Sequence, residues 1–394
     1  MRIGVLTHSA SDDNYGQLLQ CYALQEYLKK IGHQPFLIHY EVENTPKKDI
    51  LSPLKIVVRT ILNLISKKHR DAYRGVKTMK MQREINAVRN KKRMFEQFKS
   101  KNIEQTRFYG TYSELLNNPP QADVYIVGSD QVWIPMVNSY SSLAWYLQFG
   151  SKEIKRIAYA ASFGRQLNES EYEKFRTLTA IFSAISVREN KAQIYCKNAG
   201  VENVNVVLDP TCLVGMEVYM PFIQMNKTEK PYLFLYYVNV INKDDLSWNQ
   251  IESFINAKGL ELKSVSASGY YPSFDIIPNH ENLLLTIPEW INCVYHANYV
   301  ITTSFHGVVF AILMHRPFVS IPIKGMYSGG NDRVVSFLEN FDLSDRILAD
   351  SRTINDILIS PIDWTPVDTR LKELRKGSED FLIKALNYRI IKNG

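Results

Sequence analysis

The chain has 394 residues, of which 45% are hydrophobic and 22% are charged, and its formal net charge is +7. This length is enough for two domains that each bury a core, and the composition is that of an ordinary globular protein. The sequence contains no uncharged span of the length that a membrane helix needs, and residues 1–6 are too short an apolar run for a signal peptide.

The cysteines are widely spaced, at Cys21, Cys196, Cys212 and Cys293. Because the sequence has no CxxC pair and no Cys/His cluster, it contains no zinc motif, and we expect no metal site. Each cysteine lies among apolar residues, so we expect buried free thiols. Such thiols fit a reducing compartment, and we expect a cytoplasmic protein.

The first 40 residues predict a strand, a helix and a second strand. Residues 3–6 are apolar, and residues 16–30 place apolar side chains at helical spacing. Gly32 ends the helix, and residues 35–40 complete a βαβ opening. Further along this half we expect strands at 123–127, 157–161 and 184–187 and a helix at 169–182.

Residues 44–120 interrupt this alternation. They contain an apolar segment at 54–65 and then a basic run that we expect to be helical to about residue 101. Residues 67–107 hold 14 Lys or Arg against 4 Asp or Glu, a local excess of 10 positive charges. This excess is larger than the net charge of the whole chain, so the basicity is regional, and we expect a basic helical insertion here.

A second alternation begins near residue 205, and a hydrophobic strand at 232–238 opens its sheet. We expect further strands at 260–265, 300–303 and 318–321 and helices at 249–257, 288–296, 308–314 and 332–341. Residues 366–394 predict an amphipathic terminal helix. Two successive alternations predict an α/β fold with two Rossmann-like domains, at residues 1–200 and 201–365, that face each other across a cleft.

Four polar elements follow predicted strands, at residues 12–16, 128–131, 188–189 and 304–307. Because the carboxyl ends of parallel strands meet at one edge of a sheet, these elements can converge on one cleft. The first three also have purely structural alternatives. Asn14 can belong to a turn at a helix start, Asp130 can cap a helix, and Arg188 can form a surface ion pair with Glu189.

The stretch Ser304-Phe-His-Gly307 is the most informative of the four. It stands between a β-branched run and an apolar segment of helical character, so it predicts a strand, a tight turn and a helix. His306 then lies at a helix N-terminus, where unpaired N–H groups and the helix dipole favour a bound anion. Ser304 and Gly307 are candidate contacts to that anion. The alternative is a histidine that caps its own helix.

A basic, glycine-rich group follows the next predicted strand. It contains Lys324, Gly325, Gly329-Gly330 and Arg333. A loop of this composition near a histidine at a helix start makes an anion pocket chemically reasonable, and such a loop can close over a small ligand. A plain surface connection is the alternative. No GxGxxG or Walker pattern is present, so nucleotide binding has no specific support.

Short motifs recur along most of the chain, from residue 3 to about residue 333. They are Asn14-Tyr-Gly-Gln, Leu19-Gln-Cys-Tyr-Ala-Leu24, Val127-Gly-Ser-Asp-Gln-Val-Trp133, Ala160-Ala-Ser-Phe163, Ile185-Ser-Val-Arg-Glu189, Leu208-Asp-Pro210 and Thr303-Ser-Phe-His-Gly307. In this order and spacing they resemble the polysaccharide pyruvyl transferase family. The resemblance implies a fold like that of the two-domain GT-B glycosyltransferases.

The resemblance also implies an activity. Members of this family transfer the enolpyruvyl carbons of phosphoenolpyruvate onto two hydroxyls of a sugar, which forms a cyclic ketal. An arginine at the position of Arg188 and a histidine at the position of His306 are associated with the phosphoenolpyruvate site, together with a downstream lysine that Lys324 matches best. Phosphoenolpyruvate is the donor substrate in this scheme, and no cofactor is implied.

The chemistry of phosphoenolpyruvate agrees with these residue types, because its carboxylate and phosphate call for Arg, Lys and a helix N-terminus. His306 can donate a proton or stabilise the leaving phosphate. Asp130 can accept a proton from an acceptor hydroxyl, or orient that hydroxyl. Trp133 is placed to stack on a sugar face.

We therefore interpret the chain as a pyruvyl transferase that acts on a glycan precursor of a surface or capsular polysaccharide. The main alternative is a GT-B glycosyltransferase that uses a nucleotide sugar and has the same fold and cleft. A more distant alternative is a glycan-binding protein without catalysis. The basic region is not accompanied by a recognised nucleic-acid fold, so we expect no nucleic-acid partner.

Residues 51–101 predict contact with the cytoplasmic membrane face, since acceptors in this family are often lipid-linked. Each Lys or Arg near an anionic surface contributes about 1 kcal/mol of attraction. In sedimentation assays we expect salt-sensitive binding to anionic vesicles and none to neutral ones. Replacing Lys67, Lys68 and Arg70 with Glu should abolish it. If the chain binds neither kind of vesicle, these residues form only a solvated surface.

Overall fold

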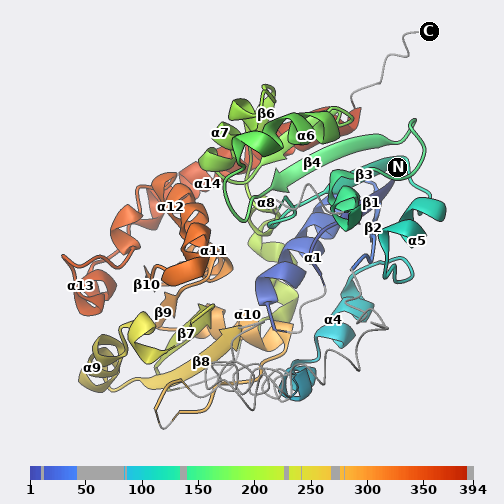
Figure 1. The fold of residues 1–394 in the computed structure, drawn as a ribbon. Coiled ribbons are helices and arrows are strands. Elements are labelled where there is room, and N and C mark those ends of the chain that lie inside the picture. Colours follow the sequence, from blue (N-terminus) through green and yellow to red (C-terminus); the bar gives the residue numbers. More distant parts are fainter. Residues whose placement is uncertain are drawn as a thin grey trace, which may run out of the picture.

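The computed structural model describes residues 1–9, 13–41, 84, 87–133, 140–225, 230–240, 242–267, 276–278 and 280–387. Two parallel β-sheets, each flanked by helices, dominate the fold (Figure 1). The apolar segment at 54–65 and the basic positions Lys67, Lys68 and Arg70 lie outside the described residues, as does the first part of the expected insertion. Vesicle contact by residues 51–101 therefore stays a prediction.

The first sheet has six parallel strands in the order β2-β1-β3-β4-β5-β6. The strands are β1 (Arg2–Leu6), β2 (Gln34–Leu37), β3 (Val124–Val127), β4 (Lys155–Ala161), β5 (Ala184–Val187) and β6 (Val204–Val206). The helices of this half are α1 (Tyr15–Lys30), α4 (Phe95–Asn102), α5 (Tyr112–Asn117), α6 (Glu169–Thr179), α7 (Asn190–Asn198) and α8 (Pro210–Leu213). Central strands such as β3 are buried throughout, because a parallel sheet has both faces covered.

The second sheet has four parallel strands in the order β10-β9-β7-β8. The strands are β7 (Tyr232–Val238), β8 (Glu261–Ala267), β9 (Tyr299–Thr302) and β10 (Phe318–Ser320). The helices are α9 (Trp248–Lys258), α10 (Ile287–His296), α11 (Phe305–Leu313), α12 (Asn331–Glu339), α13 (Ile354–Ile359) and α14 (Trp364–Asn387). The α/β fold with two parallel sheets is confirmed.

The first sheet extends further along the chain than expected. We assigned the second domain to residues from 201 onward, but Val204 in β6 pairs with Ile185 in β5, at the edge of the first sheet. The short strand β6 carries only three residues, which is too little pattern to assign it to a sheet from the sequence. Helix α7 was also not predicted. The exact limits of the two domains stay predictions.

The two sheets share one core. A single cluster of buried apolar side chains contains Ile3 and Val5 of the first sheet together with Phe234 and Val300 of the second. Helix α14 returns from the second half to the first, where the hydroxyl of Ser378 accepts a hydrogen bond from a backbone N–H of the first half. The two halves therefore pack as one body.

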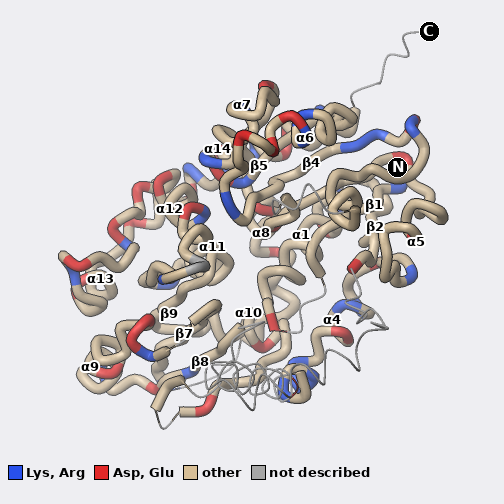
Figure 2. The backbone as a smooth tube through the Cα atoms, viewed as in Figure 1, with Lys and Arg blue, Asp and Glu red and all other residues tan. Residues whose placement is uncertain are grey.

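Part of the basic region is structural. Figure 2 shows Lys and Arg gathered in the turn before α4, which carries Lys91, Lys92 and Arg93. The Arg93 side chain is 0% exposed, and Lys99 is buried beside Glu96 at 2.5 Å. These two cations are not available to a membrane surface, which corrects the expectation for this part of the run.

None of the helices in the described parts of the chain is both long and apolar enough to cross a membrane. All four cysteines are buried free thiols, as expected. The amphipathic terminal helix is confirmed as α14, which begins two residues earlier than expected and buries Val367, Leu371 and Leu382.

Candidate active site

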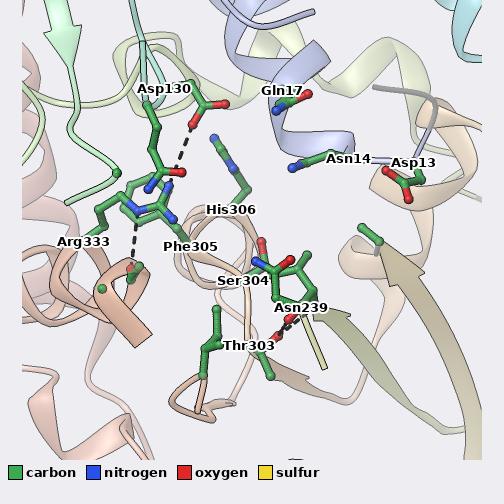
Figure 3. A pocket seen from close by; sticks show the side chains of 17 residues that line it. Asp13, Asn14, Gln17, Asp130, Asn239, Thr303, Ser304, Phe305, His306 and Arg333 are labelled. Atoms are coloured by element: carbon green, nitrogen blue, oxygen red, sulfur yellow. Dashed lines mark hydrogen bonds and ion pairs between the residues drawn. The ribbon is translucent and has the colours of Figure 1, made fainter. Parts of the chain in front are cut away.

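The carboxyl ends of both sheets border one cavity of about 290 Å³, which we call the central cavity (Figure 3). The first half contributes Asp13, Asn14, Gln17, Asp130, Gln131 and Gly164. The second half contributes Val238, Asn239, Ala267, Thr303, Ser304, Phe305, His306, Ile323, Gly329, Gly330 and Arg333. Three of the four predicted polar elements therefore converge here, and the fourth, at 188–189, lies behind the cavity wall.

His306 is the second residue of α11 and faces the cavity. Its ring lies against Gly16 at the start of α1, so closely that a methyl group built on Gly16 would overlap the imidazole. Its Nε2 lies 3.8 Å from Oδ1 of Asp209 and has no hydrogen-bond partner in the described structure. The alternative of a histidine that caps its own helix is therefore wrong, since the ring makes no hydrogen bond to α11 and its nearest charged neighbour, Asp209, lies outside that helix.

Asp209 connects the cationic groups of the site. It is buried, and its Oδ2 accepts hydrogen bonds from Arg188 at 2.7 Å and from the Ser129 hydroxyl at 2.8 Å. Its Oδ1 accepts from the hydroxyl of Thr211 at 2.6 Å. Burial alone would raise the pKa of Asp209, but nearby His306, Arg188 and the Thr211 hydroxyl outweigh it and hold that pKa far below its usual range.

Arg188 is buried rather than exposed, with 2% of its side chain accessible. Besides Asp209, it faces Asp130 at 3.6 Å and Glu189 at 3.8 Å, and its guanidinium lies over the Phe305 ring at 4.6 Å. The alternative of a surface ion pair is therefore wrong. The structure also corrects the expectation of ligand contact, because Arg188 is not among the residues that line the cavity. It supports the wall instead.

Asp130 lines the cavity and does not cap a helix in the described residues. Its backbone has φ of 71°, in the left-handed region that a non-glycine residue rarely adopts. Its Oδ1 lies 3.6 Å from Arg188 and 3.8 Å from Arg333. Burial alone would raise the pKa of Asp130, but Arg188, His8 and Arg333 outweigh it and keep the pKa below the usual value. A carboxylate held in its charged form is a weak proton acceptor.

Arg333, in the first turn of α12, supplies the positive charge of the cavity. It follows the glycine-rich loop, of which Gly329 and Gly330 line the cavity while Gly325 does not. Lys324 corrects a second expectation. Its side chain lines a separate cavity of about 440 Å³ together with Arg352. Among the described residues that border the central cavity, Arg333 is the one with a basic side chain other than histidine.

The expected stacking of Trp133 on a sugar is wrong, and Gly307 is left with only its backbone N–H, in the first turn of α11, for contact with an anion. Trp133 is 0% exposed and stacks on Tyr146 in the core of the first half, so neither face is open to a sugar. Gly307 is buried against Thr302, where a methyl group would overlap the Thr302 side chain. Glycine is needed at 307 because α11 approaches β9 closely, and Ser304 is the neighbour that lines the cavity.

Asn14 lines the cavity, and its side chain does not cap α1. The next residue, Tyr15, crosses to the second half, where its ring stacks on Trp290 at 5.3 Å and its hydroxyl donates to the Leu285 carbonyl at 2.7 Å. Arg93 donates to the Ser266 carbonyl at 2.7 Å and also reaches the Tyr15 hydroxyl at 3.2 Å. The start of α1 is therefore fixed between the two sheets.

Sequence reasoning did not single out Gly16, Gln17, Asp209 or Asn239. Gly16, Gln17 and Asp209 all stand within motifs noted above, so their positions were visible but their partners were not. Asn239 has no sequence signal beyond its place after a strand. Among the described residues, no group of three or more His, Cys, Asp or Glu side chains is arranged to hold a metal ion.

A model of the polysaccharide pyruvyl transferase family matches residues 14–325. No curated protein matches the sequence.

Among solved structures, UDP-N-acetylglucosamine 2-epimerase from Rickettsia bellii is similar, with a TM-score of 0.51 and 11% identity over 98% of this chain and 96% of that one. UDP-GlcNAc 2-epimerase from Neisseria meningitidis has a TM-score of 0.45 and 11% identity over 98% and 99%. The likeness to the Rickettsia bellii structure concerns the fold alone, and with the two parallel sheets it confirms the GT-B-like arrangement.

Asp209→Asn should lower the free energy of unfolding at neutral pH by about 3 kcal/mol or more, because it leaves the buried Arg188 charge without its closest partner. Since the folded-state pKa of Asp209 is depressed, its contribution is complete above about pH 4 and is lost as the pH falls further. In urea denaturation, the difference in the free energy of unfolding between the wild type and Asp209→Asn should therefore become smaller as the pH falls below about 4.

The matched control is Asp368→Asn, which breaks an exposed pair with His315 at 2.9 Å. We expect a change within about 1 kcal/mol for this variant. Equal stability losses for the two variants would contradict the central role of Asp209.

Proposed function

Because the chain belongs to the polysaccharide pyruvyl transferase family, we propose that it transfers the pyruvyl group of phosphoenolpyruvate to a sugar as a cyclic ketal. The sugar belongs to a glycan precursor of a surface or capsular polysaccharide, either lipid-linked or free. The observation that carries this proposal is the convergence of His306, Arg333 and the N-terminus of α11 on one cavity.

The cavity suits a small ligand with two anionic groups. Its volume of about 290 Å³ is at the low end of small-molecule sites, which span roughly 300–1,000 Å³. Arg333 can bind a carboxylate or phosphate through two N–H groups, and the first backbone N–H groups of α11 have no partner within the helix. Phosphoenolpyruvate carries one carboxylate and one phosphate, which matches these two donor sets.

The reaction needs one proton donor and two sugar hydroxyls. The methylene carbon of phosphoenolpyruvate takes up a proton and becomes a methyl group, while a sugar oxygen forms a bond to the neighbouring carbon. The second hydroxyl then attacks the same carbon, and the bond between this carbon and the phosphate oxygen breaks. Of the two hydroxyl protons released, one balances the proton gained by carbon and the other leaves with inorganic phosphate.

His306 is the group that moves this proton, because its imidazole faces the cavity and imidazole can both donate and accept a proton. The Asp209 carboxylate lies 3.8 Å from Nε2 of this imidazole and helps to position it. Asp130, with its lowered pKa, orients Arg333 rather than accepting a proton. Arg188 is a positioning residue that holds Asp130 and Asp209 in place.

Binding and turnover test this proposal separately. Saturation-transfer difference NMR of the full chain should detect phosphoenolpyruvate in preference to UDP-sugars. With glycan extracts as acceptors, phosphate release should accompany a product heavier by one pyruvate less one water. Binding of UDP-sugars without binding of phosphoenolpyruvate would instead favour the glycosyltransferase alternative, and binding of glycans alone the non-catalytic one.

His306→Asn should lower kcat by about 100-fold or more while phosphoenolpyruvate binding is kept, because it removes the proton donor but no permanent charge. Arg333→Gln should raise the KM for phosphoenolpyruvate by roughly tenfold to a hundredfold, since it removes a charged hydrogen bond. Arg370→Gln, on the exposed side of α14, is the control and should change neither. Normal turnover in both site variants would refute the assignment.

Gly16→Ala should lower turnover and change its pH dependence, because the added methyl group displaces the His306 ring from its position beside Asp209. Gly377→Ala is a matched control, since a methyl group at 377 meets no atom within 4 Å. The measurement is the turnover rate as a function of pH for the wild type and both variants. Melting temperatures show whether each variant is folded. A profile for Gly16→Ala that equals the wild-type profile would show that this contact does not position His306.

A further inference from the structure

The central cavity has two chemically different halves, and the proposed function uses only one of them. Figure 3 shows Arg333 and Asp130 on one side of His306 and Asn14 and Asp13 on the other. The first side carries the positive charge that phosphoenolpyruvate needs. The other side contains no lysine or arginine among its described lining residues.

The side of the cavity away from Arg333 presents amide groups from both sheets. Gln17 projects from the first turn of α1, where most neighbouring positions are buried. Asn239 follows β7 in the other sheet. Neither side-chain amide makes a hydrogen bond within the described structure, and both are partly accessible from the cavity. Amides both donate and accept hydrogen bonds, as sugar hydroxyls do.

Asn239 lies in a backbone turn that follows β7 and is held by hydrogen bonds. Its φ is 55°, in the left-handed region, which asparagine adopts more readily than most residues other than glycine. The hydroxyl of Thr303 fixes this turn, because it donates to the Val238 carbonyl at 3.0 Å and accepts from the Val238 N–H at 2.8 Å. Figure 3 shows these contacts beside Asn239. The backbone that carries Asn239 is therefore fixed at the cavity.

We propose that the acceptor sugar binds in this amide-lined half, with ring hydroxyls bonded to Gln17 and Asn239, so that both sheets hold one neutral pyranose ring. This inference rests on the proposed function for the identity of the reaction. His306 stands between the two halves. In this arrangement a hydroxyl of the bound sugar would face the phosphoenolpyruvate carbon across the imidazole. Specificity for the acceptor then comes from hydrogen bonds, with no charge attraction.

The test compares sugar binding with phosphoenolpyruvate binding in the same variants. The probes are the methyl glycosides of glucose, galactose and mannose, each followed by saturation-transfer difference NMR with phosphoenolpyruvate present. The variants are Gln17→Ala, Asn239→Gly and their combination. Glycine at 239 tolerates the positive φ, so the second variant removes the amide without backbone strain. Asn117→Ala, which removes an exposed amide at the end of α5, is the matched control.

We expect at least one of the three glycosides to bind the wild-type chain, and the double variant to bind it roughly tenfold more weakly, as the loss of two neutral hydrogen bonds predicts. Phosphoenolpyruvate affinity should change less than twofold, and Asn117→Ala should match the wild type. Melting temperatures confirm that each variant is folded.

Unchanged sugar binding in the double variant would overturn the inference, and so would a wild-type chain that binds phosphoenolpyruvate but none of the three glycosides. An equal loss of both ligands would also overturn it, because the amides would then support the whole cavity. A wild-type chain that binds a glycoside but no phosphoenolpyruvate would contradict the proposed function, while the effect of the variants on the glycoside would still decide where the sugar binds.

Discussion

Arg188 carries a positive charge in the protein interior, and the geometry around the cavity depends on how that charge is compensated. Three carboxylates face it, from Asp130, Glu189 and Asp209, at 2.7 to 3.8 Å. A buried cation of this kind is tolerated only when its partners are fixed, because an unpaired one costs several kcal/mol. The guanidinium thus ties the ends of β3 and β5 to the segment that enters α8. Through Asp209, the same charge cluster reaches His306 in the other half.

His306 depends on both halves of the chain for its orientation. The carboxylate beside its Nε2 comes from Asp209, which precedes α8, and the surface against its ring comes from Gly16 on α1. Tyr15, next to Gly16, is packed into the aromatic cluster of the second half against Trp290. The motif at the start of α1 therefore serves the imidazole from a distance in sequence of almost 300 residues.

The sequence predicted the architecture well, because the strands of a parallel sheet are buried on both faces and appear as continuous apolar runs. The strand expected at 232–238 is β7 with the same limits, and the polar elements expected at strand ends lie at those ends. The sequence could not show how deeply a given side chain is buried or which way it points. Trp133 follows a polar loop yet turns into the core, where partners distant in sequence cover it.

Lys324 is a second residue whose side chain points in a direction that the sequence did not predict. Ile323 lines the central cavity while its neighbour faces another cavity, as side chains on extended backbone alternate. The partners of Arg188 were equally hidden, because Asp209 is 21 residues away and meets it only through the pairing of the sheet. The order of the motifs could identify the family. Which charged side chains line the cavity and which support its wall depends on tertiary contacts.

The shared core has a consequence for how such a chain can be rearranged. If the two halves were independent modules, one half could be exchanged for that of a homologue without loss of the other's structure. Here a chimera joined between β6 and β7 would separate Tyr15 from its aromatic partners and α14 from Lys155, whose ammonium donates to the Leu386 carbonyl at 2.6 Å. A functional exchange would have to move the start of α1 together with the second half and keep α14 with the first. Recombination points in this chain follow its packing rather than its linear domain order.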